Sequence, residues 1–109
     1  MDKKTERIRE LNDAFRKSFK GGKVVTTQGV AALGDHEYHR VLQAVQEFND
    51  FNEDNDPHGE HDFGSFEYHD QKFFWKIDYY DRNMEFGSED PSDPETTARV
   101  LTIMLAEEY

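Results

Sequence analysis

The chain has 109 residues, a length that supports one domain (1–109) with a single core and not two. Its 24 acidic residues against 13 Lys and Arg give a formal net charge of −11 at pH 7, the opposite sign to that of proteins that bind nucleic acid or anionic membranes nonspecifically. The absence of cysteine excludes disulfides, thiolate metal sites and a cysteine nucleophile. With no apolar run near the roughly 20 residues of a membrane span and no recognisable secretory signal, we expect a cytoplasmic protein.

The charge is distributed unevenly along the sequence. The first 23 residues carry eight bases and four acids, a net charge of +4. The other residues carry five bases and 20 acids, a net charge of −15. Two segments, 47–62 and 78–95, hold seven acids each, and Arg82 is the one Lys or Arg in them. We therefore expect one basic helix and a broad acidic surface.

Residue periodicity predicts the elements of the first half of the chain. Apolar residues at helical spacing predict an amphipathic helix over 5–20, and the β-branched run at 24–27 predicts a short strand. Asp35 is a suitable cap for a second helix. The buried stripe of that helix is expected to consist of Tyr38, Val41, Leu42, Val45 and Phe48. The polar segment 52–64, interrupted by Pro and Gly, predicts an ordered loop.

Aromatic and polar residues alternate over 65–80, which predicts a β-hairpin. We place its two-residue turn at 70–71, so that Phe66 lies opposite Trp75. The aromatic residues then share one face of the hairpin. This arrangement predicts that Phe73 and Trp75 are core residues and not ligand contacts.

The C-terminal segment has the pattern of a helix. Asp93 and Pro94 match a helix start, with an acidic cap followed by proline in the first position. The sequence that follows is apolar on nearly all sides, which for a helix means burial in the core or cover by a partner. We therefore expect an α+β fold in the order α-β-α-ββ-α, with three helices packed on a small antiparallel sheet. The protein is expected to be a monomer, or a homodimer through this last helix.

The segment 54–62 has the chemistry most typical of a ligand site. Carboxylate and imidazole groups can hold a divalent metal ion. The candidate ligands are His58, Glu60, His61 and Asp62. Their spacing fits neither the EF-hand nor the HExxH motif. The alternative interpretation is an ordered loop whose Asp and His side chains bond backbone amides. A metal-binding protein or a metal-dependent enzyme centred on this loop is thus one hypothesis for function.

Sequence motifs for other chemistry are absent. The chain has no nucleophile elbow, no phosphate-binding loop and no dinucleotide fingerprint. This absence favours a protein that is not an enzyme and that carries no cofactor.

Three segments carry a resemblance to a known family: 7–15 (RIRELNDAF), 55–64 (NDPHGEHDFG) and 76–81 (KIDYYD), the last followed by ARVLTIMLAEEY. Together they resemble a family of small bacterial proteins catalogued as domain of unknown function 3768, common in alphaproteobacteria and on their plasmids. The resemblance implies a stand-alone single-domain protein, and it transfers no functional residue. The setting of the family on mobile elements, beside genes that counter host defence, favours an anti-restriction or anti-CRISPR role.

The acidic segments suggest how such a role could be performed. Duplex DNA presents about one negative charge per 1.7 Å of axis, and a protein that competes with it needs dense negative charge. The leading hypothesis is therefore a DNA mimic, a non-enzymatic inhibitor that occupies the basic surface of a defence nucleoprotein and does not itself bind nucleic acid or membranes. The simpler interpretation is that the acids only confer solubility. A third hypothesis is a dimeric interaction module.

The residues expected to contact such a partner form two groups, one from the second helix and its following loop and one from the end of the hairpin. They are Glu47, Asp50, Asp54, Asp56, Asp78, Tyr80, Asp81 and Glu85. Glu47 and Asp50 are expected to lie one helical turn apart on the exposed face of the second helix.

Overall fold

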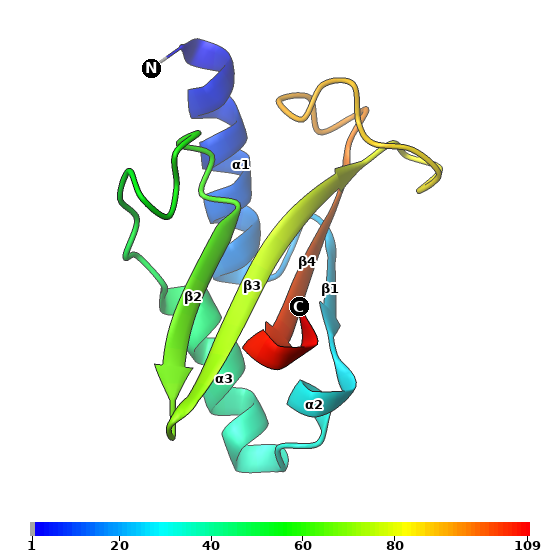
Figure 1. Ribbon diagram of the computed structural model, residues 1–109. Helices are drawn as coiled ribbons and strands as arrows, with labels where there is room; N and C mark the ends of the chain where they lie inside the picture. The colour runs from blue at the N-terminus through cyan, green and yellow to red at the C-terminus, as the bar shows by residue number, and fades with distance from the viewer. Residues whose placement is uncertain (1) are drawn as a thin grey trace.

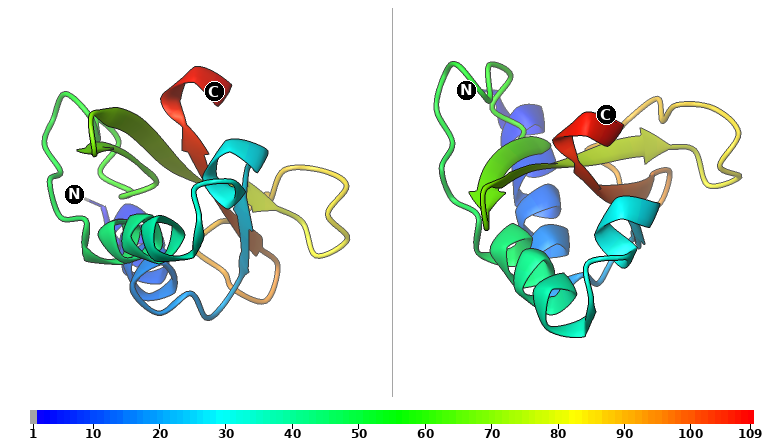
Figure 2. Two further views of the ribbon diagram at one scale, coloured as in Figure 1. Left: turned by 90° about the horizontal axis from the view of Figure 1, so that it is seen from below. Right: turned by 60° about the horizontal axis from the view of Figure 1, so that its bottom comes forward.

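The computed structural model describes residues 2–109, in which two helices pack on one face of a four-stranded sheet (Figures 1 and 2). In chain order the elements are α1 (Lys3–Ser18), β1 (Lys23–Thr26), α2 (Gln28–Ala31), α3 (Asp35–Glu47), β2 (Phe63–Tyr68), β3 (Gln71–Tyr80), β4 (Ala98–Leu105) and a 3-10 turn (Ala106–Glu108). The strand order is β1-β4-β3-β2. The α+β class with three helices is confirmed.

The first half of the chain folds close to the sequence prediction. Helix α1 begins at an acidic cap, where the Oδ1 atom of Asp2 accepts a hydrogen bond of 2.8 Å from the Thr5 amide. It ends at Phe19, whose φ of 61° is left-handed. Helix α3 differs in one detail, because Gly34 occupies the cap position and Asp35 is the first helical residue.

The predicted C-terminal helix is wrong, because residues 98–105 form strand β4 at the centre of the sheet. Strand β4 pairs in parallel with β1 and antiparallel with β3, so the sheet is mixed and not purely antiparallel. Residues that point to both faces of β4 are mostly buried, so its sequence is nearly continuously apolar and resembles that of a buried helix. The turn that contains Asp93 and Pro94 precedes the strand. The proposed dimer contact through a last helix therefore has no helix to form it.

The hairpin of β2 and β3 exists, but its predicted register is wrong. The turn residues are His69 and Asp70, with φ of 51° and 66°, so the turn comes one residue earlier than expected. Positive φ at both positions defines a type I′ turn, whose twist matches that of the strands. Phe66 consequently pairs with Phe73, and Trp75 lies opposite a glycine.

The core lies between the sheet and the helices α1 and α3. Phe73 and Trp75 are fully buried there, as the sequence predicts. Trp75 fits because its partner in β2 is Gly64, where a Cβ atom would overlap the indole ring. Among residues 2–109, no helix combines the length and apolar character needed to cross a bilayer.

Candidate functional site

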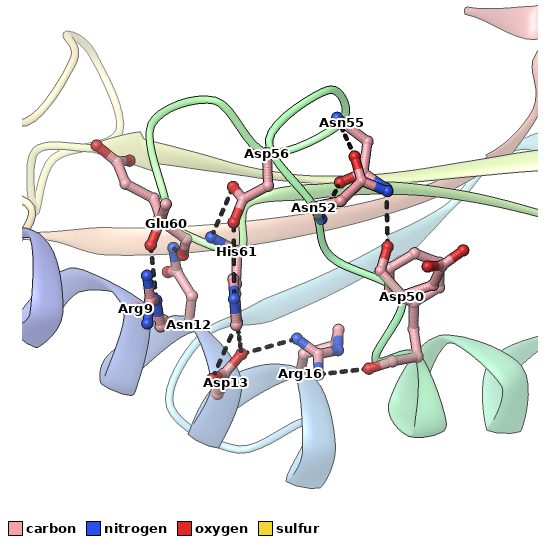
Figure 3. A network of polar contacts seen from close by, with 12 residues as sticks. Arg9, Asn12, Asp13, Arg16, Asp50, Asn52, Asn55, Asp56, Glu60 and His61 are labelled. Carbon is pink, nitrogen blue, oxygen red and sulfur yellow. Dashed lines mark hydrogen bonds and ion pairs between the residues drawn. The ribbon is translucent and has the colours of Figure 1, made fainter.

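The segment 49–62, here called the acidic loop, connects α3 to β2 and lies against α1 (Figures 1 and 3). The residues of α1 that face it are spaced by three and four positions and thus share one side of the helix: Arg9, Asn12, Asp13 and Arg16. The Nε atom of Arg9 donates to the Gly59 carbonyl at 2.7 Å. The Nδ2 atom of Asn12 donates to the Glu60 carbonyl at 2.9 Å. Side chains of α1 therefore bind backbone carbonyls of the acidic loop near the end that leads into β2.

Arg16 anchors the near end of the acidic loop. Its side chain is 1% exposed, and Nε and Nη2 donate to the carbonyls of Val45 (3.1 Å) and Phe48 (2.9 Å), where α3 ends. Its Nη1 atom donates to Oδ1 of Asp13 at 3.0 Å, and the guanidinium carbon lies 5.2 Å from the ring centre of Trp75. A buried charge is tolerated only when paired and hydrogen-bonded in this way. Arg16 thus joins α1, α3 and the core at one point.

His61, near the end of the acidic loop that leads into β2, contacts the same carboxylate (Figure 3). Its Nδ1 atom lies 2.9 and 3.1 Å from the two carboxylate oxygens of Asp13, and its ring stacks on Phe51 at 3.7 Å. The His61 amide donates to Oδ1 of Asp56 at 3.2 Å, and Nε2 lies 3.6 Å from Oδ2 of that residue. Both ring nitrogens therefore face carboxylates within the protein.

Two asparagines shape the tip of the acidic loop. The side-chain oxygen of Asn52 accepts from the amides of Asp54 (2.8 Å) and Asn55 (3.0 Å). The side chain of Asn55 in turn accepts from the Asn52 amide and donates to the Asp50 carbonyl. Such side-chain bonds replace the backbone pairing that a loop lacks. The exposed acids at the tip are thus carried by a hydrogen-bonded turn.

A second polar cluster is buried beside the first. The Oδ1 atom of Asn12 accepts from Nε of Arg99 (2.7 Å), and its Nδ2 atom donates to the Tyr79 hydroxyl (2.8 Å). That hydroxyl donates to Oε1 of Glu60 at 2.7 Å. Burial and the bond to Glu60 raise the pKa of Tyr79 far above its ordinary value, so the phenol stays a donor. Burial lowers the pKa of Arg99, whose guanidinium lies 5.2 Å from the Tyr79 ring centre.

The structure gives the four candidate metal ligands different surroundings. His61 is engaged by two carboxylates, Glu60 accepts from Tyr79, and His58 is exposed. Burial, together with the negative charge of Glu60, raises the pKa of the Asp62 carboxyl. In the part of the chain from residue 2 to residue 109, no group of three or more His, Cys, Asp or Glu is placed to hold a metal ion. The internal bonds match the alternative interpretation, an ordered loop.

The predicted contact residues near the acidic loop are only partly on the surface. Glu47, Asp50 and Asp54 are exposed, whereas the Asp56 side chain is 5% exposed and bonded to the His61 segment. The expectation that Glu47 and Asp50 share a helical face is wrong, because α3 ends at Glu47. Sequence reasoning also omitted Glu53, an exposed acid of the same loop, although its place in the run of acids could have indicated it.

The predicted contact residues at the end of β3 form a separate group. Glu85 is exposed, and Asp78, Tyr80 and Asp81 are half-buried. Asp78 is paired with Lys76 at 3.1 Å. In Figures 1 and 2 the acidic loop lies beside α1 and the start of β2, whereas the segment after β3 projects away from it, beyond the ends of β3 and β4. The two groups therefore make two patches and not one.

Hydrogen exchange provides a direct measurement of order in the acidic loop. We expect the amides of Asp56 and His61, which bond to Asn52 and Asp56, to exchange at least about 100-fold more slowly than in an unfolded peptide. The amide of the exposed Glu53 serves as the fast reference within the same loop. Asp56→Ala removes the acceptor of the His61 amide and should abolish its protection. Rapid exchange across the whole loop in the unmodified protein would contradict this expectation.

The fold and the loop define the class: a small α+β protein that presents acids on a loop held by buried polar contacts. Residues 26–108 match the family described as "Protein of unknown function (DUF3768)", and the chain belongs to that family. The match includes the segments 55–64 and 76–81 that carry the resemblance, whereas 7–15 lies outside it. Neither the curated proteins nor the solved structures include a significant match.

Proposed function

We propose that this protein is a non-enzymatic acidic inhibitor that occupies a basic nucleic-acid-binding surface. The observation that carries the proposal is the trio of exposed carboxylates Asp50, Glu53 and Asp54 on the hydrogen-bonded tip of the acidic loop. Among residues 2–109, none of the three forms an ion pair. The sequence has no Lys or Arg between Arg40 and Lys72, so this negative charge is uncompensated locally.

The anchoring of the loop supports this proposal in physical terms. Ordering a flexible segment on binding costs free energy, and a segment that is already ordered avoids that cost. Arg16 and His61 fix the loop to α1, so its carboxylates keep their spacing in solution. Fixed negative charges attract a basic groove over long range and compete there with phosphates.

The partner that fits is a basic nucleic-acid-binding protein or nucleoprotein complex of a defence system. The DNA channel of a CRISPR surveillance complex and that of a restriction enzyme are both lined by Lys and Arg. A protein that occupies such a channel blocks DNA without a chemical reaction, a cofactor or a membrane. Because these partners act in the cytoplasm, the proposal also implies a cytoplasmic protein. The plasmid setting implied by the family resemblance agrees with this choice of partner.

The test is a DNA-displacement assay on a panel of purified surveillance complexes and restriction enzymes. We expect the unmodified protein to displace target DNA from at least one panel member, and less effectively as salt rises. The triple variant Glu47→Lys, Asp50→Lys, Asp54→Lys should be at least about 100-fold weaker, because each desolvated interfacial charge contributes about 2–5 kcal/mol. Its melting transition should stay cooperative, since all three side chains are exposed.

A matched control separates local charge from overall charge. The variant Asp35→Lys, Glu67→Lys, Glu107→Lys also changes three exposed acids, and both triples move the net charge by six units, from −11 to −5. The control should inhibit within about threefold of the unmodified protein at 0.15 M salt. Full inhibition by the folded loop variant, or displacement from no panel member, would refute the proposed function.

A further inference from the structure

The segment 81–97, which connects β3 to β4, projects beyond the end of the sheet with a defined shape (Figures 1 and 2). The Asp81 amide donates to the Phe86 carbonyl at 2.7 Å, and the Ser88 amide donates to the Tyr79 carbonyl at 3.1 Å. The hydroxyls of Ser88 and Thr97 are 2.6 Å apart and join two parts of the segment just before β4 begins. The backbone of this segment is therefore ordered.

Phe86 is the unusual residue of this segment. Its side chain is apolar yet 72% exposed. It lines a cleft of about 300 Å³ together with Asp81, Gly87, Glu89 and Thr96. The Oδ1 atom of Asp81 accepts from the Glu85 amide at 3.0 Å, so its Oδ2 atom is not used in that bond. The second carboxylate, that of Glu89, belongs to an exposed residue. Among residues 2–109, no Lys or Arg lines this cleft, which thus combines an aromatic ring with two carboxylates.

The same combination already binds arginine inside this protein. The guanidinium of Arg16 lies 5.3 Å from the Phe51 ring centre and donates to the Asp13 carboxylate at 3.0 Å. We infer that the cleft at Phe86 binds an arginine side chain of the partner, with the guanidinium over the ring and its N–H groups on Asp81 and Glu89. Stacking and forked donation are properties of guanidinium that an ammonium does not share.

This inference rests on the proposed function and deepens it, since it assigns one recognition contact to the partner. A nucleic-acid channel is rich in the arginine that the cleft would hold. A second copy of this chain does not fit as the occupant, because two chains of charge −11 repel each other.

The test uses N-acetyl-arginine amide as the probe and follows amide resonances by NMR. We expect saturable shifts confined to 81–97, with a dissociation constant in the millimolar range. N-acetyl-lysine amide should bind at least about threefold more weakly. Phe86→Leu and Glu89→Gln should each weaken the arginine probe by about two- to fivefold.

The matched controls are Tyr109→Leu, at a tyrosine that is 73% exposed, and Glu107→Gln, at an exposed acid outside the cleft. Both should leave the affinity for the arginine probe unchanged. Absence of a saturable shift up to about 50 mM probe, or equal affinity in Phe86→Leu, overturns the inference. The titration needs no inhibited complex, so a failure here is distinct from a failure of the DNA-displacement assay, which tests the proposed function alone.

Discussion

Replacing Arg16 with alanine is expected to lower the free energy of unfolding by about 3–5 kcal/mol, the usual loss when one partner of a buried ion pair is removed. The substitution leaves the carbonyls of Val45 and Phe48 without their donor and leaves Asp13 with only the His61 ring. It also leaves a void beside Trp75. Urea denaturation measures the loss, and hydrogen exchange should show the acidic loop opening at the same time.

Two further variants isolate the cause of that loss. Arg16→Lys keeps the charge but lacks the fork that reaches three acceptors, so we expect it to retain only a minor part of the stability. Lys17→Ala changes the exposed neighbour in the same helical turn and should stay within about 0.5 kcal/mol of the unmodified protein. A loss below about 1 kcal/mol in Arg16→Ala would show that this arginine does not anchor the loop.

Trp75→Ala is the second substitution with a large expected effect, about 3–5 kcal/mol of lost stability. The indole is fully buried and lies 5.5 Å from the Phe48 ring and against Gly64, so truncation opens a cavity that β2 cannot fill. Thermal and urea unfolding measure the loss. Phe86→Ala, which removes an aromatic ring that is mostly exposed, is the control and should cost less than about 0.5 kcal/mol.

A conservative variant tests the polar atom of the same residue. Within residues 2–109 the indole nitrogen of Trp75 is buried and has no hydrogen-bond partner. Trp75→Phe removes that unpaired donor while keeping most of the apolar volume, so its cost should be well below that of Trp75→Ala. Equal losses in the two variants would contradict the expected benefit of removing the unpaired donor while keeping apolar volume. A loss below about 1 kcal/mol in Trp75→Ala would contradict the assignment of Trp75 as a core residue.

The sequence by itself determined the elements whose signals are local. The helices of 3–18 and 35–47 follow from apolar residues at helical spacing, and the strand at 23–26 follows from β-branched residues. The hairpin follows from alternation, which also identified Phe73 and Trp75 as core residues. These signals are readable because each depends on residues within a few positions of one another.

Strand β4 and the hairpin register were decided by tertiary structure. The apolar run at 98–105 suits a buried helix or a central strand equally, and only pairing with β1 and β3 on both sides selects the strand. The turn at His69 and Asp70 gives no strong local signal, because neither residue is glycine or asparagine. Packing of Trp75 over Gly64 accompanies the observed register.

The candidate site divides in the same way. The sequence determined that the acidic loop is polar, dense in carboxylates and free of Lys and Arg, because composition needs no fold. It did not determine which of these acids are exposed to solvent. The Asp56 side chain is buried and accepts a hydrogen bond from the His61 amide, whereas Asp50, Glu53 and Asp54 are exposed. That choice depends on contacts between α1 and the loop, such as the bond from Asn12 to Glu60, which joins residues 48 positions apart. Contacts at that separation leave no periodic trace in the chain, so only the packed structure sets them.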